Sequence, residues 1–112
     1  MSKKIQPSKL RDHILASLNK LKSVDTVVIN VKRLSSFTDY MVITSGTSSR
    51  HIQSIGEKVI EDLNDKKIKP LGVEGKGNEE WVLIDIGDVV LHLMSLKARN
   101  FYDLESLWDP DL

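Results

Sequence analysis

The 112-residue sequence predicts a single α/β domain with a mixed five-stranded sheet flanked by helices. Apolar residues recur at helical spacing in some segments, whereas other segments are short β-branched runs or alternate between apolar and polar residues. Because two expected strands flank an expected helix, at least one pair of strands should be parallel. A chain of this length has room for one core, so residues 1–112 should form one domain, with flexible ends at residues 1–6 and 109–112.

The first helix and the first strand are expected before residue 32. Pro7 suits the first turn of a helix over residues 7–22, and leucine and isoleucine recur at helical spacing between Leu10 and Leu21. Residues 24–31, VDTVVINV, are short and rich in β-branched side chains, which favours a strand.

Residues 34–52, LSSFTDYMVITSGTSSRHI, predict a strand, a turn and the start of a helix in one stretch. The strand should cover residues 40–44, and the small polar residues 45–48 should break it and provide hydroxyl N-caps. The helix should cover residues 48–64, with one apolar stripe. Gly56 within this helix indicates close packing against a neighbouring element.

A β-hairpin is the clearest local signal, and it follows a short strand expected at residues 71–74. Residues 81–86 and 89–94 flank Gly87-Asp88, which is a favoured two-residue connection. One face of this hairpin would then be wholly aliphatic and belong to the core. Its cross-strand pairs would be Ile86 with Val89, Ile84 with Leu91, and Val82 with Leu93.

The opposite face of the hairpin combines apolar side chains with one carboxylate and one imidazole. Its pairs would be Asp85 with Val90, Leu83 with His92, and Trp81 with Met94. A helix could cover this face as a second core layer, or it could be an exposed protein-docking patch, and the pattern alone favours neither. His92 could also reach Asp85 diagonally, and a structural hydrogen bond is the more expected role for such a pair than catalysis.

A final helical segment should follow a short linker at residues 95–97 and stop at Asp109-Pro110. Helical spacing would place four apolar side chains on one side of it: Phe101, Leu104, Leu107 and Trp108.

Composition narrows the classes of function. No apolar run approaches the ~20 residues that span a bilayer, and the absence of cysteine fits a reducing cytoplasm, so a cytoplasmic protein with no membrane partner is expected. The net charge of zero hides an asymmetry: residues 1–69 carry 13 Lys/Arg against 7 Asp/Glu, and residues 70–112 carry 3 against 9. An acidic C-terminal part suits a basic partner better than nucleic acid, unless the two halves interleave in space.

Catalytic groups are hard to find. The Ser45-Gly46-Thr47 loop faintly resembles the strand-to-helix turn of nucleotidyltransferases, but it lacks the Walker lysine and the three-glycine fingerprint. Such enzymes also need two or three converging carboxylates for divalent metals, whereas the next strand offers only Glu74, and Asp85 and Asp88 lie across a hairpin turn. A nucleotide-binding enzyme centred on this loop remains the alternative function, and RNA binding by the basic N-terminal half is a third.

Histidines occur singly, at His13, His51 and His92, without the spacing of metal ligands. His13 should be exposed on the first helix, and His51 should lie beside a helix cap. We therefore expect no catalytic residue, no cofactor site and no metal site.

Four stretches, taken in order, resemble the ribosomal silencing factor family, also called the Iojap-like family. They are LSSFTDYMVITSGTSSRHI, LGVEG, EWVLIDIGDVVLHLM and ARNFYDLESLW. Each stretch is a weak signal alone, but the set is specific and, in this order and spacing, covers nearly the whole chain from Val24 to Trp108.

The resemblance implies a nucleotidyltransferase-like core without catalytic carboxylates and a non-enzymatic translation repressor. Family members bind the large ribosomal subunit through its L-fourteen protein, block joining of the small subunit, and lower translation when nutrients are scarce. It also implies homodimers when the protein is free, with direct RNA contact at most minor.

The docking surface is expected on the second hairpin face and the nearby C-terminal segment. Trp81 and Tyr102 should be its anchors, because large aromatic side chains dominate interface energetics. The full expected set is Glu74, Trp81, Asp85, His92, Met94, Tyr102 and Asp103.

Overall fold

The computed structural model describes residues 5–78 and 80–108, which form four helices and five strands. In chain order these are α1 Pro7–Lys20, β1 Val24–Asn30, β2 Tyr40–Gly46, α2 Ser49–Asp65, β3 Gly72–Glu74, β4 Trp81–Asp85, β5 Val89–Ser95, α3 Leu96–Tyr102 and α4 Leu104–Trp108. Of the ends expected to be flexible, residues 1–4 and 109–112 lie outside the described residues. Ile5 packs against the core and Gln6 is the N-cap of α1. None of the helices in the described ranges is long and apolar enough to cross a membrane.

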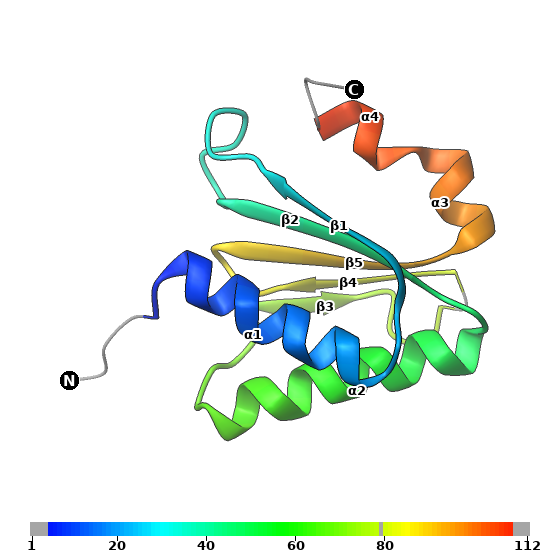
Figure 1. Cartoon of the computed structure of the whole chain (residues 1–112), viewed down its shortest axis with the longest axis horizontal. Helices are drawn as coiled ribbons and strands as arrows, with labels where there is room; N and C mark the ends of the chain where they lie inside the picture. Colours follow the sequence, from blue (N-terminus) through cyan, green and yellow to red (C-terminus); the bar gives the residue numbers. More distant parts are fainter. Residues whose placement is uncertain (1–4, 79, 109–112) are drawn as a thin grey trace.

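The five strands form one mixed sheet in the order β1-β2-β5-β4-β3. β2 and β5 are parallel, and the other three neighbouring pairs are antiparallel. Figure 1 shows α1 and α2 on one side of the sheet, and α3 and α4 on the other. The predicted fold class is therefore confirmed, including its parallel strand pair.

The hairpin of β4 and β5 has the predicted register. Ile84 pairs with Leu91 and Val82 with Leu93 on the aliphatic face, and the Ile86 N–H donates to the Val89 carbonyl at 2.9 Å. These side chains are buried between the sheet and the helices α1 and α2. Hydrophobic alternation and the turn together were sufficient to set this register.

A second, smaller core lies on the other face of the sheet, under α3 and α4. Its buried members are Ile29, Val31, Met41, Ile43, Met94 and Ala98. Trp81, Leu104 and Trp108 pack against this cluster and are only partly buried. The second hairpin face is thus covered by helix at one end, which combines the two alternatives that the sequence left open.

The sheet is open, and both of its edges are irregular or short. β1 forms one edge, and its register with β2 shifts between Val24 and Val27, where Asp25 has a φ of 51°. β3 forms the other edge and has three residues. Such features are common in edge strands, where they discourage pairing with another chain.

β2 continues two residues beyond its expected end. Ser45 and Gly46 pair with Met94 and Ser95 of β5, so the small residues do not break the strand. Small side chains alone do not predict a strand here, but the backbone of the parallel neighbour β5 supplies the hydrogen bonds that extend it. The turn then needs only Thr47 and Ser48, which separate β2 from α2.

The start of α2 is fixed by the polar residues that the sequence indicated. The Ser48 hydroxyl accepts a hydrogen bond from the His51 N–H at 3.1 Å, which confirms the predicted N-cap. The His51 ring also accepts from the Thr47 N–H at 2.9 Å through Nδ1, and its Nε2 lies 2.7 Å from the Leu21 carbonyl. His51 therefore links the turn to the end of α1, as a capping neighbour.

The C-terminal segment differs from the single helix that the sequence predicted. Ser95 is not in a linker: it ends β5, and its hydroxyl caps α3 by accepting from the Ala98 N–H at 3.0 Å. The helix then breaks at Asp103, whose backbone is left-handed with φ 48° and ψ 55°. The break rotates α4, so Leu104 and Trp108 face the second core while Phe101 and Leu107 are exposed. The predicted common apolar side is therefore wrong.

Gly46 provides a test of how tightly β2 packs against α2. A Cβ at this position would lie 2.8 Å from Cγ1 and 3.0 Å from the backbone nitrogen of Ile52. We expect Gly46→Ala to lower the free energy of unfolding by about 1–3 kcal/mol, because atoms must shift in a packed interior. Urea denaturation measures this change. Gly72→Ala is the control, since a Cβ there meets nothing within 4 Å, and an equal effect of both substitutions would contradict the packing argument.

Candidate partner-docking surface

Three aromatic rings from three elements meet beside the end of the sheet. Trp81 is the first residue of β4, and its ring centroid lies 4.9 Å from that of Tyr102 at the end of α3. The same indole lies 5.8 Å from the ring of His92 in β5. Its Nε1–H donates to His92 Nδ1 at 3.0 Å. The indole is thus held between a strand neighbour and a helix.

His92 is a buried support for Trp81. Its side chain lies under the indole, and burial lowers its pKa from 6.5 to about 4. The imidazole is therefore neutral at pH 7. Its Nδ1 can accept the hydrogen bond from the indole only when the imidazole proton is on Nε2. His92 Nε2 is buried and has no hydrogen-bond partner among the described residues. A buried polar atom without a partner is unfavourable, and this unfavourable term accompanies the placement of an acceptor under Trp81.

His92 and Asp85, which the sequence showed could reach each other diagonally, have other partners. Asp85 Oδ1 accepts from the Gly87 N–H at 2.9 Å and so stabilises the hairpin turn. The imidazole instead accepts from Trp81, the other diagonal neighbour of His92 on the same face of the hairpin. Asp85 lies at the far end of β4 from Trp81, about 13 Å away at the usual rise of a strand.

Met94 is not an exposed anchor. It is fully buried, with 0% of its side chain exposed, in the second core beside Ala98 of α3. The helix begins directly after β5 and folds over this end of the face, which the sequence pattern alone did not determine. His92 and Met94 therefore lie beneath the surface rather than on it.

Exposed aromatic and acidic groups surround Trp81. Tyr102 is 53% exposed, and its neighbour Phe101 is 79% exposed and meets it edge-on, with centroids 5.0 Å apart. Asp103 is exposed directly after Tyr102, and Glu74 borders a shallow hollow that Trp81 also lines. We call these five residues the Trp81–Tyr102 patch. An aromatic centre with acids at its rim is typical of protein-binding surfaces.

Arg99 attaches α3 to the sheet and was missed by the sequence reasoning. Its side chain is 8% exposed, and its Nη1 donates to the Ser45 hydroxyl at 3.2 Å and to the Val24 carbonyl at 3.3 Å. Its Nε pairs with Glu105 of α4 at 3.4 Å. A buried arginine that loses its partners is strongly destabilising, so these bonds hold both short helices, and with them Tyr102, in place. An arginine in a charged segment gives no sequence signal of such burial.

The glycine turn lacks the groups that nucleotide chemistry needs. Gly46 is buried against α2, and the hollow beside it contains one carboxylate, that of Glu80. Asp85 lies five register positions away along β5, about 17 Å at the usual rise of a strand. The described residues thus bring no second carboxylate to this turn.

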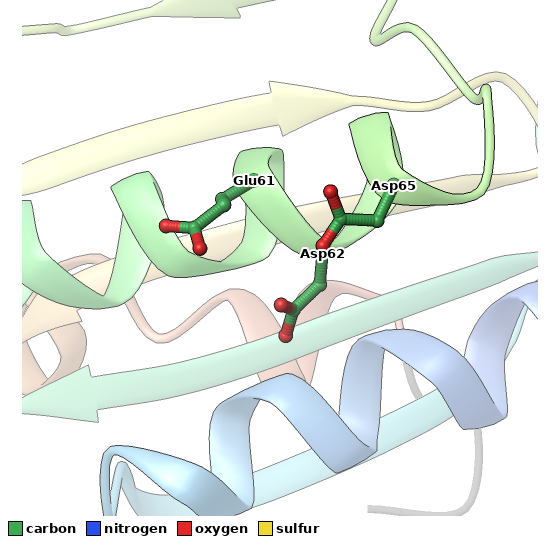
Figure 2. Close-up of side chains that lie close together, drawn as sticks. All are labelled: Glu61, Asp62 and Asp65. Atoms are coloured by element: carbon green, nitrogen blue, oxygen red, sulfur yellow. The ribbon is translucent and has the colours of Figure 1, made fainter.

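One group of three carboxylates lies close enough to share a cation, among the described residues: Glu61, Asp62 and Asp65 of α2. Figure 2 shows Asp62 directed toward α1. Asp62 accepts from the Ser17 hydroxyl at 2.6 Å and pairs with Lys20 and Lys58. The Ser17 hydrogen bond is the main reason that the pKa of Asp62 is lowered. These partners account for the group as an ion-pair network between α1 and α2.

His13, which was expected to be exposed, is instead half-buried and lines the hollow between these two helices.

The fold and the surface define a small α/β domain with an exposed aromatic patch suited to binding another macromolecule. A family model described as "Ribosomal silencing factor during starvation" matches residues 4–111. The chain belongs to this family of ribosomal silencing factors, as the sequence resemblance indicated.

Individual relatives agree with this assignment. The ribosomal silencing factor of Haemophilus influenzae is 35% identical over 99 residues, covering 88% of this chain and 97% of that protein. The mouse protein named mitochondrial assembly of ribosomal large subunit protein 1 is 34% identical over 100 residues, covering 87% of this chain and 44% of that protein. A crystal structure of a Chromobacterium violaceum protein superimposes with a TM-score of 0.90 at 30% identity, covering 93% of this chain and 87% of that one.

Stability should depend on pH through His92. In the unfolded chain an imidazole titrates near pH 6.5, whereas His92 in the fold has a pKa of about 4. The unfolded state binds more protons between these values, so the stability from neutral His92 is complete above about pH 6.5 and is lost as the pH falls toward 4. The loss should reach about 3 kcal/mol.

Urea denaturation at pH 7 and pH 4.5 measures this dependence. The difference in free energy of unfolding between the two pH values should shrink by about 2–3 kcal/mol in His92→Leu. His13→Gln should keep the full difference and controls for loss of another histidine. An unchanged difference in His92→Leu would show that the imidazole is not held neutral by burial.

Proposed function

We propose that this chain is a translation repressor that binds the large ribosomal subunit through its L-fourteen protein. Bound there, it blocks joining of the small subunit and lowers translation when nutrients are limited. It acts in the cytoplasm without catalysing a reaction, and it forms a homodimer when free. Membership of the ribosomal silencing factor family supports this function, and the mouse relative is named for assembly of the large ribosomal subunit.

The Trp81–Tyr102 patch is the observation that carries the proposal. Trp81 is held by His92 and Tyr102, so little conformational freedom is lost when a partner covers it. Exposed aromatic side chains on rigid supports are the usual centres of binding energy. Two flanking acids, Glu74 and Asp103, suit a basic ribosomal protein. Asp85 would contribute only at the margin, because it lies at the other end of β4.

The supporting roles follow from burial. His92 and Met94 would contribute indirectly, His92 by orienting the indole and Met94 by filling the core beneath it. The acids would change the association rate and its salt dependence more than the residence time.

The alternative is a nucleotide-using enzyme centred on the Ser45-Gly46-Thr47 loop. The burial of Gly46 and the single carboxylate nearby do not favour it. This alternative predicts measurable affinity for nucleotide with Mg²⁺. A calorimetric titration that shows no heat of binding would contradict the alternative.

Removing either aromatic anchor tests the proposed function. Trp81→Ala and Tyr102→Ala should each abolish co-sedimentation with purified large subunits, because a central aromatic contributes about 2–4 kcal/mol, or a 30-fold or greater loss of affinity. Leu71→Ala is the control, since Leu71 is 75% exposed and lies directly before β3, where its N–H donates to the carbonyl of Asp85 at the far end of β4 from Trp81. Circular dichroism should show an intact fold in all three variants.

A subunit-joining assay completes this test. Wild-type protein should prevent association of large and small subunits, whereas the two aromatic variants should not. Unchanged co-sedimentation of both variants would contradict the assignment of the docking surface. Binding without any block of joining would contradict the proposed mechanism.

A further inference from the structure

The connection between β1 and β2 is an ordered loop that projects beyond the end of the sheet (Figure 1). Its base is closed by the Val31 N–H, which donates to the Asp39 carbonyl at 2.9 Å. The Val31 carbonyl accepts from the N–H groups of Leu34 at 2.9 Å and Ser35 at 2.8 Å. The Ser35 hydroxyl then accepts from the Phe37 N–H at 3.1 Å. The backbone of the loop is therefore held in one conformation.

This ordered loop presents an aromatic ring to solvent. Phe37 is 90% exposed, and Leu34 in the same loop is 51% exposed. Neither belongs to the two core clusters. Because the ring is exposed, it adds no buried apolar area to the core. It is therefore available to a partner.

Cations surround the base of the loop. Lys32 and Arg33 are both exposed, and Lys32 Nζ lies 5.3 Å from the centroid of the Tyr40 ring. Arg11 of α1 lies 4.9 Å from the same centroid. The two elements thus bring positive charge to one end of the molecule.

Three acids also lie at this end of the molecule. Asp12 pairs with Arg11 at 3.0 Å, and Asp39 and Asp88 are half-buried below the loop. Within the loop of residues 32–37, the exposed charged residues are Lys32 and Arg33. A free aromatic face next to two exposed cations is the combination that binds single-stranded nucleic acid, because bases stack on the ring and phosphates meet the cations.

We propose that the loop of residues 32–37 binds single-stranded or loop RNA, with Phe37 stacked on a base and Lys32 and Arg33 on phosphates. This inference rests on the proposed function, since the RNA would be that of the large subunit. The loop lies at the Tyr40 end of β2. Trp81 lies level with Ser45 of β2, because Met94 of β5 pairs with both residues. The two surfaces therefore lie about 17 Å apart along the strands, and a protein and an RNA segment can be contacted together.

Photo-cross-linking gives the first test. Phe37 is replaced by p-benzoylphenylalanine, the protein is bound to purified large subunits, and the complex is irradiated. Cross-links to ribosomal RNA support the proposal. Cross-links to ribosomal protein only, or none from a bound complex, overturn it. The same replacement at Leu71 is the control for exposed apolar positions and should give no RNA cross-link.

Binding to an isolated oligonucleotide separates this inference from the proposed function. A fluorescent single-stranded RNA of mixed sequence is titrated with the whole chain at several salt concentrations. Phe37→Ala should weaken binding about tenfold. The double variant Lys32→Ala/Arg33→Ala should reduce the slope of log affinity against log salt by about 1.4. Lys66→Ala/Lys69→Ala removes two exposed lysines elsewhere and should leave the slope less affected.

The two experiments fail in different ways. If the chain does not bind large subunits, the proposed function is wrong, and the RNA titration alone decides whether the loop binds RNA. In that case, absence of binding, or equal effects of the loop variant and the Lys66/Lys69 variant, overturns the inference.

Discussion

The parallel pairing of β2 with β5 is the constraint on which the rest of the molecule depends. It joins residues 40–46 to residues 89–95, and every residue of β2 is buried. A strand covered on both faces needs a complete set of backbone partners, because its polar groups cannot reach water. The pairing extends as far as Gly46 and Ser95. It therefore fixes where α2 and α3 begin, on opposite faces of the sheet.

The aromatic patch is a consequence of that register. β5 places His92 beside Trp81 of β4, and α3 starts at the end of β5, which brings Tyr102 back onto the indole. Arg99 then ties α3 to the end of β2 through the Ser45 hydroxyl. Each contact involves residues whose positions follow from the central strands. The exposed patch thus has a rigid base, even though Phe101 and Tyr102 lie at the end of a short helix and Glu74 lies on a short edge strand.

Much of this could be predicted from the sequence, because hydrophobic period and turn chemistry are local signals. The register around Gly87-Asp88, the N-cap at Ser48 and the mixed sheet all follow from such signals. Burial of Met94 could not be predicted, since it depends on where α3 folds. Nor could the Trp81–His92 bond, because several partners lie within reach of an imidazole on a sheet face. The residue contacts at the site were set by tertiary packing.

The two edges of the sheet limit how copies of the chain can associate. One edge is interrupted by the irregularity between Val24 and Val27, and the other is the three-residue β3. Neither presents a long, regular row of free backbone groups, so growth of the sheet from one molecule into the next is disfavoured. This protects the protein from edge-to-edge aggregation at high concentration. Self-association would instead bring faces together, and would then compete for the exposed side chains that a heterologous partner needs.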